Sequence, residues 1–393
     1  MKFKKLTIAA VAALAVAATA SLANAAEPVD PADVKVGIIY IGDENEGYTA
    51  AHMAGIDAMQ EALGLSDDQV IEKTLIGEDE TCADAAFDLA DQGCQIVFAN
   101  SFGHETYLME AAGEYPDVQF CHATGFQAAS SGLANMHNYF DNIYEARYVS
   151  GVVAGMKLNE MIADGTITEE EAKIGYVGAY PYAEVISGFT SFYLGAKSEC
   201  PSVTMEVKYT NSWASFDLEK ECADALISDG CKLIAQHADT TGAPTACQAA
   251  GIPCVGYNVS MIETAPDSAL TSSTNNWGIY YTYAVQSIID GTEIDTDWTA
   301  GLADGAVLIS DLNENVVAEG TAEKVEEVEA AIIDGSLKVF DTSTWTVNGE
   351  TLDSYVKEGS DIDYISDGYF HESEYGSAPA FDIIIDGIEC VAE

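Results

Sequence analysis

Polar and aromatic side chains stand together at the points where short apolar runs of this sequence end. Aromatic faces stack on flat rings, and Asn, Asp, Glu and Thr side chains hydrogen-bond to the edges of such rings. These residue types suit a flat, neutral heterocycle, and they would suit a sugar as well. The candidate ligand contacts are Tyr48, Thr49, Ser101, Phe102, Glu184, Trp213, Asp239, Asn258, Asn276 and Trp277.

Each candidate also has a purely structural alternative. The four aromatic candidates could equally pack at an interface between lobes. Glu184 and Asp239 could be helix N-terminal acids, whose charge the helix dipole favours. Arg147 is the only arginine in the chain, and we expect it to form a structural salt bridge rather than to contact a ligand. The residues alone leave these alternatives open.

The sequence lacks the common motifs of catalysis and of metal or phosphate binding. It has no G-x-S-x-G motif, no phosphate-binding loop and no C-x-x-C pair, and its six histidines are scattered. Pairs of carboxylates are too common in so acidic a chain to indicate a site. We therefore expect neither an enzyme nor a bound cofactor or metal. The alternatives are a secreted nucleoside or glycoside hydrolase, with Glu184 and Asp239 as acid and base, and an extracellular ligand-sensing domain.

The apolar runs alternate with Ala-rich amphipathic segments, a pattern typical of βαβ units and a mostly parallel sheet. The layout occurs twice, because CADAAFDLADQGCQIVFANS (82–101) resembles ECADALISDGCKLIAQHAD (221–239). Gly93 and Gly230 stand where the helix of each copy would end. Strands are predicted at 36–41, 70–76, 95–99, 118–122 and 134–139, and then at 173–177, 204–209, 232–236, 253–257 and 269–272.

The fold class is therefore α/β, with two similar lobes whose strand ends face each other across a cleft. In such proteins a hinge closes the lobes over the ligand. Helices are also predicted at 276–290 and 322–334, and a strand at 306–310. The tail has strand-like pieces at 337–347 and 380–391 and is expected to form a small β-rich extension. The predicted domains are lobe 1 (34–139 with 276–300), lobe 2 (140–275 with 301–336) and the C-terminal extension (337–393).

Residues 1–25 have the layout of a secretory signal peptide, with Lys2, Lys4 and Lys5 ahead of an apolar run and small residues up to Ala25. Without them the chain has 12 Lys and Arg against 65 Asp and Glu, a formal charge of −53. Such a surface repels phosphate backbones and anionic lipids, so no nucleic-acid or membrane-surface partner is expected. No cysteine lies near the predicted cleavage site, so no lipid-attachment signal is expected there. We expect an exported monomer, periplasmic or extracellular, without a lipid anchor.

The chain has nine cysteines, and export would place them in an oxidising compartment where some are expected to pair. The disulfides Cys222–Cys247 and Cys231–Cys254 are predicted, because the elements that carry these residues would be neighbours in this fold.

Several motifs, in order along the chain, resemble a known family. They are GYTAAHMAG (47–55), FANSFGH (98–104), FCHATG (120–125), YFDNIYEARYVSGVVAG (139–155), IGYVGAYPYAEVISGFTSFYLGA (174–196), NSW (211–213), QHADTTG (236–242) and GLADG (301–305). Together, from about Val34 to Asp334, they resemble the basic membrane protein (BMP) family of ABC-transporter substrate-binding proteins, which includes bacterial purine nucleoside receptors. The resemblance implies a type I periplasmic-binding-protein fold of two Rossmann-like lobes joined by three crossovers, which delivers a small-molecule ligand to an ABC permease.

The resemblance also implies positions for some ligand contacts. The loop aromatic after the first strand falls on Tyr48 with Thr49 beside it, the acid of the second lobe falls on Glu184, and the NSW and QHAD motifs place Trp213 and Asp239 at the cleft.

Two positions differ from the nucleoside receptors. Those receptors have an Asp and a Lys, both associated with the ribose hydroxyls, where this chain has Asn258 and Asn275. The resemblance therefore implies a purine-type ligand that is a nucleobase rather than a nucleoside.

Overall fold

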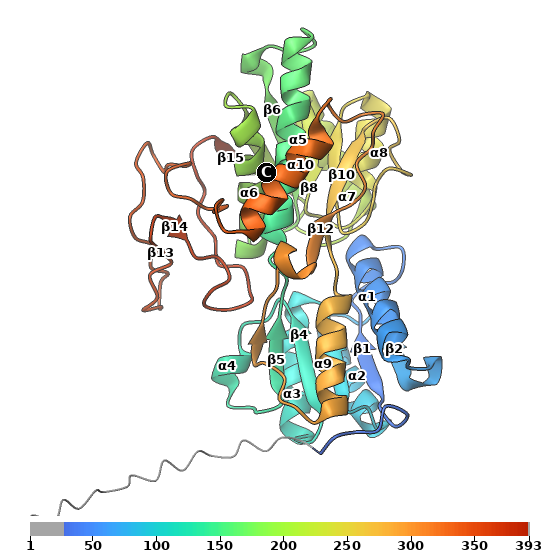
Figure 1. Cartoon of the computed structure of the whole chain (residues 1–393). Helices are drawn as coiled ribbons and strands as arrows, with labels where there is room; N and C mark the ends of the chain where they lie inside the picture. The colour runs from blue at the N-terminus through green and yellow to red at the C-terminus, as the bar shows by residue number, and fades with distance from the viewer. Residues whose placement is uncertain (1–26, 392–393) are drawn as a thin grey trace, which may run out of the picture.

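The computed structural model describes residues 27–391, so the predicted signal peptide at 1–25 lies outside the described residues. The described chain forms two α/β lobes, one above the other in Figure 1, each built on its own sheet. The two-lobed α/β architecture predicted from the sequence is confirmed.

Lobe 1 is a parallel sheet with helices on its faces. Its first strand is buried along its whole length, as expected for a continuous apolar run in a parallel sheet. The helices are α1 (Gly47–Leu63), α2 (Glu80–Asp91), α3 (Glu105–Glu114), α4 (Ala128–Ser131) and α9 (Gly278–Asp290). The strands are β1 (Val36–Ile39), β2 (Val70–Lys73), β3 (Ile96–Ala99), β4 (Gln119–Ala123), β5 (Met136–Tyr139) and β11 (Asp297–Trp298), in the order β11-β5-β4-β3-β1-β2.

Lobe 2 repeats this plan with a seven-stranded sheet. Its helices are α5 (Ile143–Ala163), α6 (Ala183–Glu199), α7 (Phe216–Ser228), α8 (Gly242–Ala250) and α10 (Thr321–Ile333). Its strands are β6 (Lys173–Gly178), β7 (Thr204–Tyr209), β8 (Leu233–Gln236), β9 (Cys254–Tyr257), β10 (Ala269–Asn275), β12 (Val307–Ile309) and β15 (Ile388–Cys390), in the order β12-β10-β9-β8-β6-β7-β15. All these strands pair in parallel except β12, which is antiparallel to β10.

The chain crosses between the lobes after β5, after β10, and again between β11 and β12. The first crossing leads into α5, which packs directly against α6. Glycines allow this close approach, since a Cβ on Gly151 or Gly155 of α5 would meet backbone atoms of α6, and one on Gly195 of α6 would meet α5. The helix that follows the first crossing is thus packed backbone to backbone against α6 in lobe 2.

All ten strands predicted for the two lobes are present, with ends that differ by at most three residues. The strand predicted at 70–76 ends early, at Lys73, and Leu75 beyond it has a left-handed φ of 58°, which a strand does not accommodate. The glycines predicted to end the duplicated helices do so, with φ of 86° at Gly93 and 93° at Gly230.

The C-terminal extension contains less strand than its sequence suggests. The stretch 337–347, predicted as strand-like, contains none of the named strands and forms turns instead. There the Asp341 side chain accepts a hydrogen bond from the Ser343 backbone N–H (2.8 Å), which closes a local turn. The remaining strands are the short hairpin of β13 (Ile365–Ser366) and β14 (Tyr369–Phe370), and β15, which joins the edge of the lobe 2 sheet beside β7. These segments lie beside lobe 2 in Figure 1.

The disulfide predictions are wrong for both pairs, Cys222–Cys247 and Cys231–Cys254. Cys231, Cys247 and Cys254 are free thiols. The strands that carry or follow these residues are neighbours, as expected, since β8 pairs with β9, but adjacency alone does not bring two Sγ atoms to bonding distance.

Candidate ligand-binding cleft between the lobes

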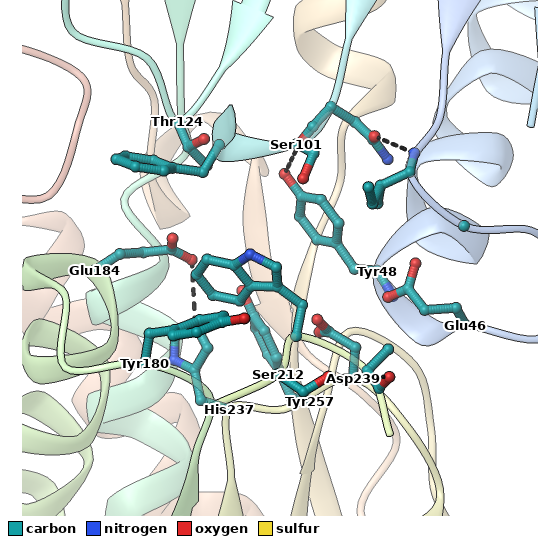
Figure 2. A pocket seen from close by; sticks show the side chains of 16 residues that line it. Glu46, Tyr48, Ser101, Thr124, Tyr180, Glu184, Ser212, His237, Asp239 and Tyr257 are labelled. Atoms are coloured by element: carbon teal, nitrogen blue, oxygen red, sulfur yellow. Dashed lines mark hydrogen bonds and ion pairs between the residues drawn. The ribbon is translucent and has the colours of Figure 1, made fainter. Parts of the chain in front are cut away.

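The facing strand ends of the two lobes enclose a cavity of about 310 Å³, here called the cleft cavity (Figure 2). This volume lies at the lower end of the range for small-molecule sites. Lobe 1 contributes Ile41, Gly42, Glu46, Tyr48, Asn100, Ser101, Phe102 and Thr124. Lobe 2 contributes Tyr180, Glu184, Ser212, Trp213, Ala214, His237, Asp239 and Tyr257. Each lobe therefore supplies aromatic rings and hydrogen-bonding groups to the same space.

On the lobe 1 side, the β1–α1 loop positions Tyr48. Glu46 caps α1, because its carboxylate accepts hydrogen bonds from the backbone N–H of Tyr48 (2.9 Å) and of Thr49 (2.8 Å). The Tyr48 hydroxyl donates to the Asn100 carbonyl (2.7 Å), and the edge of its ring packs on His52. The hydroxyl is thus occupied within lobe 1, and the face of the ring is the part left for a ligand.

On the lobe 2 side, three side chains form a hydrogen-bonded chain that ends in the cavity. Arg147 of α5 donates to the Gln236 carbonyl (2.7 Å) and to His237 Nδ1 (3.3 Å), and its guanidinium lies 3.7 Å from the centre of the Tyr257 ring. His237 Nε2 lies 3.1 Å from Glu184 Oε1. In Figure 2, Glu184 and His237 face each other on the side of the cavity opposite Tyr48.

These hydrogen bonds determine which nitrogen of His237 carries the proton and make Glu184 an acceptor. Arginine can only donate, so His237 Nδ1 must accept and the single ring proton is on Nε2. Burial lowers the pKa of His237 and thus favours this neutral form, with the nearby Arg147 charge as a lesser cause. Glu184 is therefore the acceptor from His237, and its second oxygen remains to accept a hydrogen bond from a ligand.

Asp239 has the opposite character. Burial raises its pKa well above the usual range, and the neighbouring carboxyls of Glu46, Glu219 and Glu184 raise it further, so the protonated form is favoured. Asn258 Nδ2 donates to Asp239 Oδ1 (2.6 Å), which leaves the other oxygen to carry the proton. The cleft thus holds two carboxyl groups of different character: Glu184, which accepts from His237, and Asp239, whose raised pKa favours the protonated form.

The lobes also touch beside the cavity. The backbone N–H of Gly47 in lobe 1 donates to the Asp239 carbonyl in lobe 2 (2.9 Å), and a Cβ on Gly47 would come within 3.0 Å of that oxygen. On another side, Phe102 of lobe 1 stacks on Tyr182 of lobe 2, with ring centres 5.4 Å apart. The described conformation is therefore one in which the lobes are closed against each other.

Six of the ten predicted contact residues line the cavity, namely Tyr48, Ser101, Phe102, Glu184, Trp213 and Asp239. The other four lie behind it, each with a structural partner. Thr49 Oγ1 accepts from the Gly42 N–H (3.2 Å), Asn258 holds Asp239, and Asn276 donates to the Gly305 carbonyl (3.0 Å) at a crossover. Trp277 is fully buried in lobe 1 and stacked on His52 at 4.2 Å.

The salt bridge expected for Arg147 is also corrected. Within residues 27–391 this guanidinium forms no ion pair with an acid, and it contacts a carbonyl, a neutral histidine and a tyrosine face instead. The predicted contact residues did not include Glu46, Tyr180, His237 and Tyr257, which also line the cavity. Strand-end position marks the last three, whereas nothing distinguishes Glu46 from the many other acids of the chain.

Among residues 27–391, no helix is both long enough and apolar enough to cross a lipid bilayer. The same part of the chain has no group of three or more His, Cys, Asp or Glu side chains placed to hold a metal ion. Two α/β lobes that enclose a polar and aromatic cavity define the class of type I periplasmic-binding proteins.

Comparison with known proteins identifies the family. The family profile described as Bmp, ABC transporter substrate-binding protein PnrA-like, matches residues 34–341. The chain therefore belongs to the Bmp family, as the sequence motifs implied, and it is an ABC transporter substrate-binding protein of the PnrA-like type.

Individual relatives agree with this assignment. The chain is 34% identical over 331 residues to a purine-binding protein of Brucella abortus, covering 81% of this chain and 89% of that protein. It is 30% identical over 305 residues to a candidate ABC transporter glucose-binding protein of Haloferax volcanii, covering 77% of this chain and 73% of the relative. A solved ABC transporter solute-binding protein from Aeropyrum pernix has a TM-score of 0.64 at 18% identity and covers 78% of this chain and 93% of its own, which supports the fold alone.

Proposed function

We propose that this protein captures a free purine-type base in the cleft cavity and presents it to an ABC permease for uptake. The observation that carries the proposal is the pairing of an acceptor and a donor on one wall. Both line the cavity from lobe 2, and in each one carboxyl oxygen is already engaged, by His237 at Glu184 and by Asn258 at Asp239. The second oxygen of Glu184 can accept, and the raised pKa of Asp239 favours a protonated second oxygen that can donate. A purine such as adenine has an amino group that donates beside a ring nitrogen that accepts, so its edge is complementary to this pair.

The aromatic residues of the cavity support a flat ligand. Tyr48 comes from lobe 1, while Tyr180 and Trp213 come from lobe 2, where their rings pack edge to face with centres 5.0 Å apart. Stacking of a base on an aromatic side chain stabilises binding by about 1–3 kcal/mol per ring in nucleic-acid complexes. The name of the Brucella abortus relative agrees with a purine, whereas that of the Haloferax volcanii relative favours a sugar.

The residues at the two positions that are associated with ribose in the nucleoside receptors, Asn258 and Asn275, favour a base over a nucleoside. Asn258 is engaged with Asp239 and lies outside the cavity lining, and Asn275 is buried and also outside that lining. Neither offers the charge that the nucleoside receptors have there. The cleft would then bind the base through its edge and faces and make no charged contact to a sugar.

The test is a panel of ligands added to the purified protein without residues 1–25, read by thermal shift and by calorimetry. Adenine should raise the melting temperature, since a ligand at 100 times its Kd adds about 2.7 kcal/mol of stability. Adenosine, uracil and glucose serve as matched comparisons. A shift with glucose or uracil and none with any purine would overturn the proposal.

We further propose that the site binds its ligand without converting it, and that the protein is exported and acts as a monomer outside the cytoplasm. Prolonged incubation with adenosine, inosine and guanosine should leave each nucleoside intact by chromatography. Release of free base would instead favour the hydrolase alternative, with Glu184 and Asp239 as its acid and base.

A further inference from the structure

A second cavity of about 520 Å³, here called the side cavity, opens beside the cleft cavity. Lobe 1 contributes Phe126 to its wall and lobe 2 contributes Tyr182. The third wall comes from the C-terminal extension, through Tyr364 and the segment 378–382. These extension residues lie beyond residue 341, where the match to the family profile ends. The side cavity is therefore formed partly by a segment that the family profile does not cover.

Three exposed aromatic rings line the side cavity. Phe126 is 62% exposed, Tyr182 is 42% exposed and Phe102 is 38% exposed. They form a continuous row, since the ring of Phe102 lies 6.4 Å from that of Phe126 and 5.4 Å from that of Tyr182. Clustered exposed apolar surface on a soluble protein marks a binding site far more often than scattered single residues do.

The loop that carries Phe126 is held in place rather than free. Glu105 accepts hydrogen bonds from the backbone N–H of Phe126 (2.9 Å) and of Gln127 (2.8 Å). On the extension, Tyr364 is stacked on Phe370 with ring centres 5.4 Å apart, and Lys357 lies 3.4 Å from Asp382. The walls are thus fixed before any ligand arrives, which lowers the ordering cost of binding.

The two cavities are joined through shared residues. Phe102, Thr124 and Glu184 line both of them. Glu184 is the acceptor that, in the function proposed above, binds the amino group of a purine. A substituent on that amino nitrogen would leave one N–H for Glu184 and would extend past Glu184 toward the aromatic row.

We propose that the side cavity is a second subsite of the same ligand, which takes a flat apolar group attached to the exocyclic amino nitrogen of the base. The aromatic row supplies stacking surface for such a group. Lys357 Nζ is paired with Asp382 Oδ2 on the wall, and the remaining acid is Glu184, so the subsite disfavours an anionic group and suits a neutral one. This inference rests on the proposed function and defines the class of purine as one substituted on its amino group.

The test compares adenine, N6-benzyladenine and adenosine by calorimetry on the purified protein. N6-Benzyladenine should bind at least about tenfold more tightly than adenine, because the added ring stacks on the aromatic row. Phe126→Ala should remove most of this gain and leave adenine binding unchanged, since Phe126 does not line the cleft cavity. Ala378→Trp, which fills the side cavity from the extension, should do the same. Ile333→Ala is the matched control, because Ile333 is an apolar residue that is 52% exposed and lines neither cavity.

The outcomes separate the two proposals. If adenine binds but N6-benzyladenine binds no more tightly, or if its gain survives both variants, the subsite is overturned and the proposed function stands. A gain for adenosine that Phe126→Ala removes would also overturn it, because the subsite would then take a sugar. If no purine binds at all, the proposed function fails first and this inference fails with it.

Discussion

Replacing Glu184 by Gln removes one charge from the cleft and keeps the size of the side chain. His237 Nε2–H donates to Glu184 Oε1 over 3.1 Å, and only 13% of the Glu184 side chain is exposed, so water screens the contact little. The new amide must turn its oxygen to His237, which points its NH2 group at the ligand's own donor. A hydrogen bond to a charged acceptor contributes about 1.5–3 kcal/mol, so Kd for adenine should rise roughly 10- to 100-fold.

The assay is isothermal titration calorimetry of adenine into the wild type and the variant at pH 7. Glu323→Gln is the matched control, because Glu323 is also an acid in the first turn of a helix but is exposed on α10. If Glu184 served only the helix dipole, both variants would lose a similar small amount of stability and neither would lose affinity. Adenine binding to Glu184→Gln within threefold of the wild type would refute the assigned role.

Further predictions concern stacking, protonation and the acidic surface. Trp213→Ala should weaken adenine binding at least about tenfold by calorimetry, and an unchanged Kd would remove Trp213 from the site. Binding should weaken as pH rises through the raised pKa of Asp239, and Asp239→Asn should flatten that profile, which a steady affinity in the wild type would contradict. Burial raises the pKa of Glu372 to about 7, so the folded state binds more protons than the unfolded state between about pH 4.5 and 7. Stability should therefore fall over that range, by at most about 3 kcal/mol from this group, and the melting temperature of Glu372→Gln should depend less on pH. With 65 Asp and Glu against 15 Lys and Arg in the whole chain, raising NaCl from 0.05 M to 1 M should raise the melting temperature by screening repulsion, and a fall would contradict this.

The fold followed from the sequence because its signals are local. Apolar runs of four to six residues between Ala-rich helices indicate buried parallel strands, and Gly93 and Gly230 mark the helix ends in both copies of the duplicated unit. The extension is different. Its residues 337–347 have strand-like composition, yet Asp341 closes a turn through its side chain. The disulfide predictions failed because sequence indicates which elements are neighbours, as β8 and β9 are, but not the direction of two Cβ atoms that a disulfide requires.

The site was predicted only in part, because sequence gives the end of a strand but not the direction of a side chain. The segments NSW (211–213) and NNW (275–277) look alike in sequence, yet Trp213 lines the cleft while Trp277 is buried against His52 in the core of lobe 1. Nothing in the sequence distinguishes Glu46 from the other Asp and Glu residues, of which the chain has 65 in all. The role of Arg147 depends on His237 and Tyr257, which are about 90 and 110 residues away in the chain and meet it only in the folded lobe.

The measurement that tests the central claim most directly is a crystal structure of the protein with adenine. The account predicts density for a flat ring in the cleft cavity between Tyr48 of lobe 1 and Trp213 of lobe 2. The exocyclic amino group should lie within hydrogen-bond distance of Glu184, and a ring nitrogen within that distance of Asp239. Adenine bound elsewhere, or bound in the cleft with its edge turned away from both carboxyl groups, would contradict the account.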